Sequence, residues 1–327
     1  MFKKPAALTA AVCAALCAIT CAVAPSPAYA ASGRYWNTGL GGTTMKFLSM
    51  QASPRSAALS GAGVASPVRL SEVTRNPLAI TSVSQAEIGY SQTVFGDAGA
   101  DNFVNIFYGL PLNDLFALSM GIEFLGYGDI EGRDEEGFLT DNYSAYAWAA
   151  QAGIGNHGDA FGWSVQARFA YQTIDDESSL AILGDAGALY HVSRYFSLGA
   201  TITNFGYVTD SEYDGAAEAA PMALQAGLSG TIPVGSLLHL ESMWDVRLSA
   251  DIYRRADMED PEWRFGGEVS YQEFISLRAG YALRPETEDG LSAGIGITFG
   301  SCVFDYGYSP RVALGSGNHY LGVGYRF

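Results

Sequence analysis

The sequence is short of positive charge and of cysteine. It has 18 Lys and Arg residues against 34 Asp and Glu residues, a formal net charge of −16. Nucleic-acid binding requires a basic surface that contacts phosphates, so this composition excludes a nucleic-acid partner. Three of the four cysteines fall within the first 30 residues, which leaves Cys302 alone in the remainder. The remainder therefore has no cysteine pair for a disulfide or a cysteine metal site, and we predict no cofactor or metal.

The first 30 residues have the features of a secretion signal. Two lysines precede an uncharged run over residues 6–24, and Ala28-Tyr-Ala30 matches an A-x-A cleavage site. This arrangement predicts a signal peptide over residues 1–30, with Ala28 and Ala30 at the cleavage site. A lipoprotein is the alternative, because cysteines lie in the uncharged run, but none of them follows a convincing lipobox. Removal of the two lysines would leave 16 basic against 34 acidic residues, a net charge of −18.

After the signal, no uncharged apolar stretch is long enough for a transmembrane helix, which needs about 20 residues. What the sequence does have is 39 Gly and 19 Tyr residues. An exported chain of this composition is either a soluble β-protein or a membrane β-barrel, and the periodicity of the strands must decide between the two.

From about residue 85 onward, apolar and polar residues alternate in one segment after another. In residues 163–172, for example, Trp163, Val165, Ala167, Phe169 and Tyr171 lie opposite Ser164, Gln166, Arg168 and Gln172. Because successive side chains of a strand point to opposite faces, each such segment has an apolar and a polar side. The predicted strands are 85–92, 102–110, 115–127, 143–154, 162–174, 183–192, 195–206, 220–232, 237–249, 263–272, 275–284, 290–299, 301–308 and 318–327.

Two properties of these segments favour the membrane over a soluble sandwich. Many reach about ten residues, the length that crosses a bilayer at the tilt of a barrel strand, whereas ordinary strands are nearer five or six. Their polar faces also carry charges of both signs that can pair inside a lumen. The residues assigned to this lumen polar face are Arg168, His239, Glu241, Asp245, Arg247, Arg264, Glu268 and Arg278.

The predicted connections alternate between short and long. The short set is 111–114, 155–161, 193–194, 233–236, 273–274 and 300, and the long set is 93–101, 128–142, 175–182, 207–219, 250–262, 285–289 and 309–317. Short periplasmic turns and longer external loops are typical of transmembrane barrels. We therefore predict an all-β fold, a transmembrane antiparallel β-barrel of about 14 strands in the cell outer membrane, with residues 85–327 as the barrel.

The last residues resemble a barrel-assembly signal. Gly322, Tyr325 and Phe327 place aromatic residues three and five positions after a glycine. Alternation would put Tyr325 and Phe327 on the lipid face, at the aromatic girdle of the barrel. The partners that follow from this pattern are outer-membrane lipid and the barrel-assembly machinery.

Residues 31–84 do not alternate and are dense in small residues. Such a stretch can pack inside a lumen as a plug, and a periplasmic extension is the alternative. Arg55 is then a candidate internal anchor that pairs with a lumen carboxylate.

Within this stretch, Ser53-Pro-Arg-Ser-Ala-Ala-Leu59 is followed by Gly61, Gly63 and Asn76-Pro77. This pattern resembles the PorV/PorQ family, which is similar in turn to the FadL-type transporters. The resemblance is specific over about residues 40–80 and architectural over the rest. The residues that carry it, which we call the hatch motif, are Ser53, Pro54, Arg55, Ser56, Ala57, Ala58, Leu59, Gly61, Gly63, Asn76 and Pro77. The resemblance implies a fourteen-stranded barrel with an N-terminal hatch over residues 31–84. It also implies a non-enzymatic role in type IX secretion or surface attachment, with secretion components or sorting-domain cargo as partners.

Catalytic patterns lack the context that their chemistry requires. Gly290-Leu-Ser292-Ala-Gly294 matches the G-x-S-x-G pattern of serine hydrolases, but it lies in a predicted strand with no helix after it. The four histidines have no metal-ligand spacing, and Arg133, Arg254 and Arg255 are interpreted as loop charges. We therefore predict a protein that is not an enzyme. The leading hypothesis for function is the secretion role, and a FadL-like transporter of a hydrophobic small molecule is the alternative. A structural barrel or a simple porin is a third candidate.

Overall fold

A computed structural model describes residues 43–96, 102–134, 137–175, 177–209, 219–234, 244–272, 274–284, 290–311 and 316–327. The predicted signal peptide and its cleavage residues Ala28 and Ala30 lie outside these ranges. No helix in the described part of the chain is long and apolar enough to cross a membrane.

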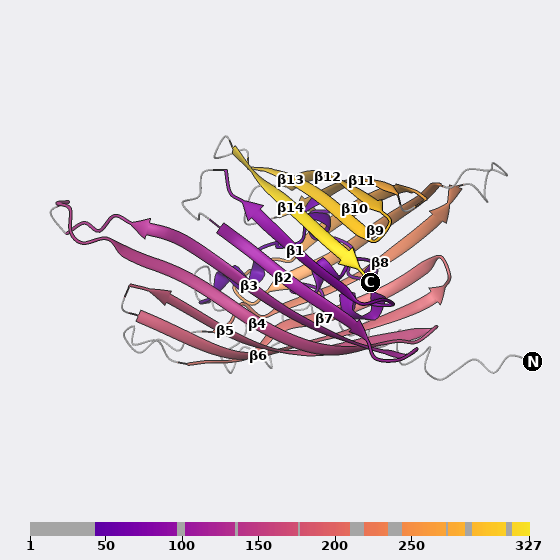
Figure 1. The fold of residues 1–327 in the computed structure, drawn as a ribbon, viewed down its shortest axis with the longest axis horizontal. Helices are drawn as coiled ribbons and strands as arrows, with labels where there is room; N and C mark the ends of the chain where they lie inside the picture. Colours follow the sequence, from indigo (N-terminus) through magenta and orange to yellow (C-terminus); the bar gives the residue numbers. More distant parts are fainter. Residues whose placement is uncertain are drawn as a thin grey trace, which may run out of the picture.

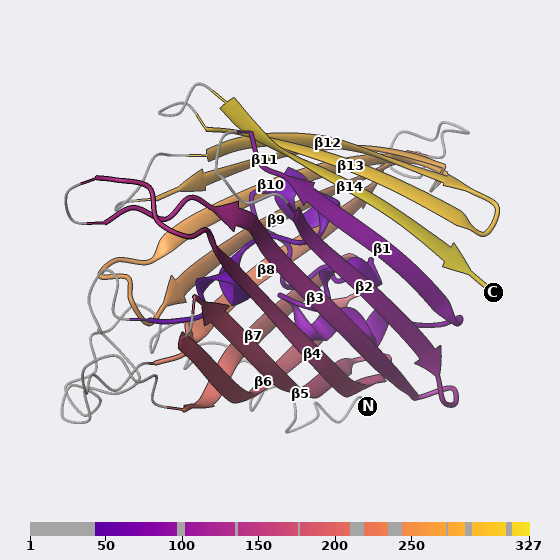
Figure 2. The same ribbon diagram turned by 60° about the vertical axis from the view of Figure 1, so that its left-hand side comes forward.

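Fourteen antiparallel strands form a closed barrel, in which β1 pairs with both β2 and β14 (Figures 1 and 2). Every strand pairs with its neighbours in sequence order, so the topology is a continuous up-and-down barrel. The strands are β1 Glu87–Val94, β2 Asn102–Pro111, β3 Phe116–Ile130, β4 Tyr143–His157, β5 Phe161–Ile174, β6 Glu177–Ser193, β7 Phe196–Val208, β8 Ala223–Pro233, β9 Trp244–Arg255, β10 Glu262–Tyr271, β11 Ile275–Leu283, β12 Gly290–Phe299, β13 Cys302–Arg311 and β14 Ser316–Arg326. The predicted fold, including the strand number, is confirmed.

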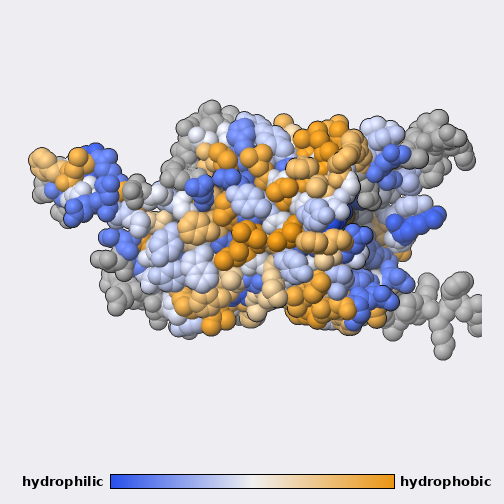
Figure 3. Space-filling view, in the orientation of Figure 1, coloured by the Kyte–Doolittle hydropathy of each residue, from blue (hydrophilic) through white to orange (hydrophobic). Residues whose placement is uncertain are grey.

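The two faces of the wall follow the alternation of the sequence. On β5, Val165 and Phe169 are exposed on the outside, whereas Gln166 and Arg168 are buried in the lumen. Figure 3 shows apolar residues spread over the outer wall. An apolar exterior around a polar interior is the arrangement that a lipid bilayer requires of a barrel.

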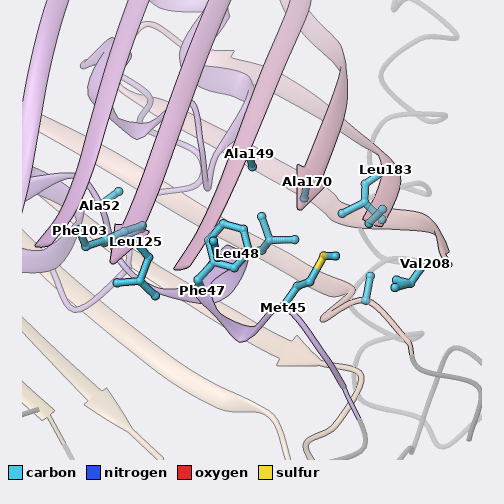
Figure 4. Packing of buried hydrophobic residues seen from close by; sticks show 13 residues of the cluster. Met45, Phe47, Leu48, Ala52, Phe103, Leu125, Ala149, Ala170, Leu183 and Val208 are labelled. Carbon is cyan, nitrogen blue, oxygen red and sulfur yellow. The ribbon is translucent and has the colours of Figure 1, made fainter. Parts of the chain in front are cut away.

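Residues 43–84, which we call the hatch, lie inside the barrel (Figure 2). Their short helices are η1 Lys46–Ser49, α2 Pro54–Ala58, η2 Leu70–Glu72 and η3 Pro77–Ser82. Phe47 and Leu48 of η1 are buried in a cluster with Phe103 and Leu125 of the wall (Figure 4). A second cluster packs Leu70 and the residues around η3 against β2 and β3. The predicted plug is therefore present, and apolar packing holds it against β2–β6.

The predicted position of one strand is wrong. Residues 237–249 were expected to form the ninth strand, but β9 runs from Trp244 to Arg255 and pairs with β8 and β10 over that range. Arg254 and Arg255 therefore belong to β9 and are not loop charges. The alternation continues with unchanged parity through residues 238–252, so periodicity alone does not locate the ends of the strand.

The prediction for the connections is correspondingly wrong in two places. The predicted loop over residues 250–262 is shorter, because β9 continues to Arg255 and β10 begins at Glu262. Residues 235–243, on which the predicted turn and the predicted start of the ninth strand fall, lie outside the described residues. The connection between β5 and β6 covers only residues 175–176, where a long loop was expected. The turns at 112–115, 158–160, 194–195, 272–274 and 300–301 are short as predicted, and we call this rim of the barrel the turn end. It is the rim predicted to face the periplasm.

Candidate functional site

The interface between hatch and barrel is the candidate functional site. Helix α2 of the hatch lies at this interface, and local sequence signals define where it starts and ends. Ser53 precedes the helix and its side chain accepts a hydrogen bond from the Ser56 amide, while Pro54 occupies the first helical turn. Serine at the N-cap and proline at the next position both favour a helix start. The helix ends where Ser60 and Gly61 adopt positive φ angles of 53° and 80°. The Gly61 amide donates to the Ser56 carbonyl at 2.8 Å, which closes the helix end.

Glycines on the inner wall let α2 approach the backbone of β11–β14. A Cβ atom on Gly280 would lie 2.2 Å from the carbonyl carbon of Leu59, and one on Gly307 would lie 2.5 Å from the Pro54 oxygen. A Cβ on Gly294 would meet the Ala58 methyl at 2.5 Å. The small residues of the hatch motif and the glycines of the wall therefore form one closely packed contact.

A buried charge network joins α2 to strands β9, β10, β11 and β13 of the wall. Arg55, 1% exposed, donates from Nε to Glu268 of β10 at 2.9 Å and from Nη1 to Glu72 of η2 at 2.7 Å. Glu268 also accepts from Arg247 of β9 at 2.5 Å and from Arg278 of β11 at 2.7 Å. Charged groups are rarely buried unless they are paired, so the position of each of these side chains depends on the others.

The network continues from Arg278 to a further carboxylate. Arg278 donates from Nη1 to Asp305 of β13 at 2.6 Å, and the Nε atom of Arg69 lies 3.6 Å from the same carboxylate. Arg69 and Glu72 belong to the hatch, so the network contains residues of both hatch and wall. Glu72, Asp305 and Arg69 were not singled out from the sequence, because their roles depend on partners that are distant in the chain.

A second network anchors the hatch to β3, β5 and β6. Arg75 of the hatch lies 3.0 Å from Glu123, and Arg168 lies 3.0 Å from Asp185 and 3.7 Å from Glu123. Arg168 also donates to the Thr74 carbonyl of the hatch at 2.7 Å. Both halves of the barrel thus hold the hatch through buried ion pairs.

Asp251 of β9 holds the segment that follows α2. One of its carboxylate oxygens, Oδ2, accepts hydrogen bonds from the amides of Gly63 and Val64 at 2.8 and 2.9 Å. The same oxygen accepts from the Gln225 side chain at 2.7 Å. The glycine fits here because its φ angle is 108°. Asp251 was missed in the sequence because it falls in the stretch that was predicted to be a loop.

The remaining predicted site residues take varied positions. Asn76 caps η3 by accepting from the Leu78 amide, and Pro77 begins that helix. Arg264 is 8% exposed in the lumen, pairs with Glu262 and stacks on Tyr253. Asp245 is exposed near the turn end, and His239 and Glu241 lie outside the described residues.

The residues of the predicted assembly signal are on the last strand. Gly322 faces the lumen, where a Cβ atom would lie 3.0 Å from Pro54, and Tyr325 and Phe327 are exposed on the outer wall.

The residues of the tempting catalytic patterns make structural contacts instead. Ser292, of the G-x-S-x-G pattern, lies within β12, donates to the Ala58 carbonyl at 2.9 Å and sits 2.7 Å from the Ser60 hydroxyl. Within the described ranges, no group of three or more His, Cys, Asp or Glu residues could hold a metal ion. Arg133 is exposed and pairs with Glu131, as expected of a loop charge.

Two spaces adjoin the hatch. A cavity of about 440 Å³ opens at the turn end, between hatch residues 67–70 and 82–85 and the wall. A second space, of about 40 Å³, lies between residues 48–64 and strands β7–β10. The second space is close to the volume that one water molecule occupies in the liquid, about 30 Å³, so the hatch and the wall are closely packed beside β7–β10.

Comparison with known proteins relates this architecture to outer-membrane transport barrels. No family model and no curated protein matches the sequence. The toluene transporter TbuX of Ralstonia pickettii matches in structure with a TM-score of 0.58 and 13% identity, over 84% of this chain and 98% of that chain. The CymD monoaromatic hydrocarbon channel matches with a TM-score of 0.57 and 12% identity, over 87% and 99%. A FadL homologue of Pseudomonas aeruginosa matches with a TM-score of 0.47 and 12% identity, over 84% and 98%.

These similarities show the fold. The chain has the fold of the transporter TbuX and the channel CymD, in agreement with the predicted outer-membrane location and with the prediction of a non-enzymatic protein. The PorV/PorQ resemblance of the hatch motif stays a prediction.

Proposed function

We propose that the protein is a transporter that passes a small hydrophobic molecule across the outer membrane, with the hatch as its gate. The observation that carries this proposal is a hatch packed inside a closed fourteen-stranded barrel similar in fold to TbuX and CymD, which are described as a toluene transporter and a hydrocarbon channel. Between the described residues of hatch and wall, a cavity of about 440 Å³ opens at the turn end, and a space of about 40 Å³ lies further in, beside β7–β10. On this proposal the structure is a closed state, and passage requires the hatch or the wall to move.

Uptake by cells with and without the gene tests this proposal. We expect a deletion strain to take up radiolabelled toluene several-fold more slowly than its parent, and the intact gene to restore the rate. A hydrophilic solute such as glycerol should enter both strains equally, since its entry uses other channels. Equal uptake of toluene and of a panel of larger apolar compounds by both strains would contradict transport.

The hatch motif supports a second candidate function, in type IX secretion. In this structure the motif's serine, proline and arginine seat α2 in the barrel, a role that a transporter needs equally. The motif therefore does not separate the two functions. Correct surface display of every sorting-domain protein in the deletion strain would contradict the secretion role, and loss of display with normal apolar uptake would favour it.

A further inference from the structure

The cavity at the turn end is lined mainly by polar and charged side chains, with Leu70 and Val83 of one apolar cluster at its edge. Its volume is about 440 Å³. Four arginines line it, together with two carboxylates and several serines: Arg69, Arg247, Arg278, Arg326, Glu87, Glu268, Ser270 and Ser276. A purely apolar molecule would gain nothing from such a lining, because its contacts would displace water from charged groups.

The charges around the cavity do not cancel. Within the described part of the chain, Arg55, Arg69, Arg247 and Arg278 are grouped around three carboxylates, which are Glu72, Glu268 and Asp305. Arg326 and Glu87 form a separate pair at 2.9 Å. Asp245 is on the same face of β9 as Arg247 but is exposed at the rim. The buried group therefore carries one positive charge in excess, inside a protein whose overall charge is −16.

Two of the arginines also present unused hydrogen-bond donors to the cavity. A guanidinium group has five N–H donors. Among the described residues, Arg247 donates only to Glu268 and Arg326 only to Glu87, and their side chains are 25% and 27% exposed. Arg69 borders the same space; its Nη2 donates to the Thr298 hydroxyl at 3.2 Å, and its Nε lies 3.6 Å from the Asp305 carboxylate. Guanidinium donors with an excess positive charge suit a carboxylate or a phosphate group, which accept such bonds in pairs.

We propose that this cavity is a binding site for a small anion bearing a carboxylate or phosphate group, with Arg247, Arg326 and Arg69 as its donors. The site is independent of the transport proposal, because it can be occupied whether or not apolar molecules cross the barrel.

Calorimetric titration of the purified, detergent-solubilised protein tests the site. The probes are benzoate, inorganic phosphate and, as a neutral analogue of benzoate, benzyl alcohol. We expect saturable binding of at least one anion, weakened by added salt, and none of benzyl alcohol. Binding of benzoate alone assigns the site to carboxylates, and binding of phosphate alone assigns it to phosphates. Absence of saturable binding for both anions would overturn the proposal.

Three variants place the binding in this cavity. Arg247→Gln leaves Glu268 with two other arginines and should weaken anion binding roughly tenfold, the value of one charge-assisted hydrogen bond. Glu87→Gln removes a negative charge from the lining and should tighten binding several-fold. Arg194→Gln is the matched control, because Arg194 is exposed in a turn at the same end but outside the cavity, and its affinity should stay unchanged.

Because Arg247→Gln should weaken anion binding and Glu87→Gln should tighten it, the pair of variants distinguishes an effect on the site from a loss of folding. A variant that fails to fold loses its heat-dependent migration in SDS gels, whereas Glu87→Gln must both fold and bind more tightly. Equal affinity of the Arg247→Gln, Glu87→Gln and unaltered proteins would place the anion elsewhere and refute the assignment.

Discussion

Glu268 is the carboxylate at the centre of the charge network that joins α2 to the wall. It accepts hydrogen bonds from Arg55, Arg247 and Arg278 and is 4% exposed. Removal of one partner from a buried ion pair is costly because the other charge stays buried without compensation. The hatch arginine is therefore held by a carboxylate that the wall supplies.

Neutralising this carboxylate should destabilise the folded barrel. We expect Glu268→Gln to lower the free energy of unfolding by about 3 to 5 kcal/mol, since the buried Arg55 and Arg278 and the partly exposed Arg247 lose a shared anion. The measurement is the urea midpoint of heat-dependent gel migration or tryptophan fluorescence. Glu131→Gln is the control: Glu131 pairs with Arg133 at the surface, where removal costs about 1 kcal/mol or less. Equal midpoints for the two variants would contradict the dependence of the hatch on Glu268.

The close contact between Gly280 of β11 and the Leu59 backbone should seat the hatch against the wall. Gly280→Ala places a methyl group 2.2 Å from the Leu59 backbone, so the hatch must shift away from β11. We expect a looser plug, seen as raised ion conductance in planar bilayers. Gly267→Ala is the matched control, because a Cβ atom there meets only the Leu248 side chain at 3.6 Å, on the outer face. Conductance that is the same in both variants would show that the contact with Leu59 does not seat the plug.

At the scale of elements, alternation predicts most of the wall but not the ends of β9. Leu238, Leu248 and Ile252 all share one parity, so residues 237–255 read as a single continuous strand. The register is set by pairing instead: Ile252 lies opposite Ala226 of β8 and Trp263 of β10. Such partners are distant in sequence, and single-strand periodicity contains no information about them.

The observed bounds of β9 have a direct test. Ile252→Pro removes a backbone N–H and introduces a ring in a strand that is paired on both sides, and proline is not tolerated in the middle of a sheet. We expect the variant to lose the folded, heat-modifiable band entirely. Ile252→Ala keeps the N–H and loses only the side chain, so it should still fold. A proline variant that folds normally would instead support the predicted loop over residues 250–262.

The hatch shows a similar division between what sequence does and does not reveal. Its helix starts are visible locally, because Ser53-Pro54 and Asn76-Pro77 are N-cap and first-turn pairs. The contacts that hold the hatch in the barrel are not visible locally. Of the arginines in the hatch, only Arg55 was identified as an anchor from the sequence. The other contacts need the folded wall to bring Glu123, Asp251 and Asp305 inward.

At the scale of the whole molecule, ion pairs hold the hatch to both halves of the barrel, but the apolar packing is uneven. Apolar clusters around Phe47 and Leu70 pack the hatch against β2–β7 in addition to the ion pair of Arg75 with β3, whereas ion pairs from Arg55 and Arg69 tie it to β10 and β13. The cavity at the turn end lies on the charged side. Hydration of the charged side costs less than hydration of the apolar clusters, because its groups retain hydrogen bonds to water. We therefore expect gating movements to begin on the side of β9–β13.

A reversible cross-link between α2 and this side tests whether the hatch must move. The hydroxyls of Ser60, just after α2, and Ser292 of β12 are 2.7 Å apart, and both residues are buried. In a Cys302→Ser background, the double variant Ser60→Cys/Ser292→Cys should form a disulfide that fixes the hatch to the wall. We expect oxidised cells to take up apolar probes no faster than the deletion strain, and dithiothreitol to restore uptake. Each single cysteine variant should transport normally under both conditions, because neither can form the link. Transport that persists when mass spectrometry shows complete cross-linking would place the path elsewhere, through a change in the wall while the hatch stays fixed at β12.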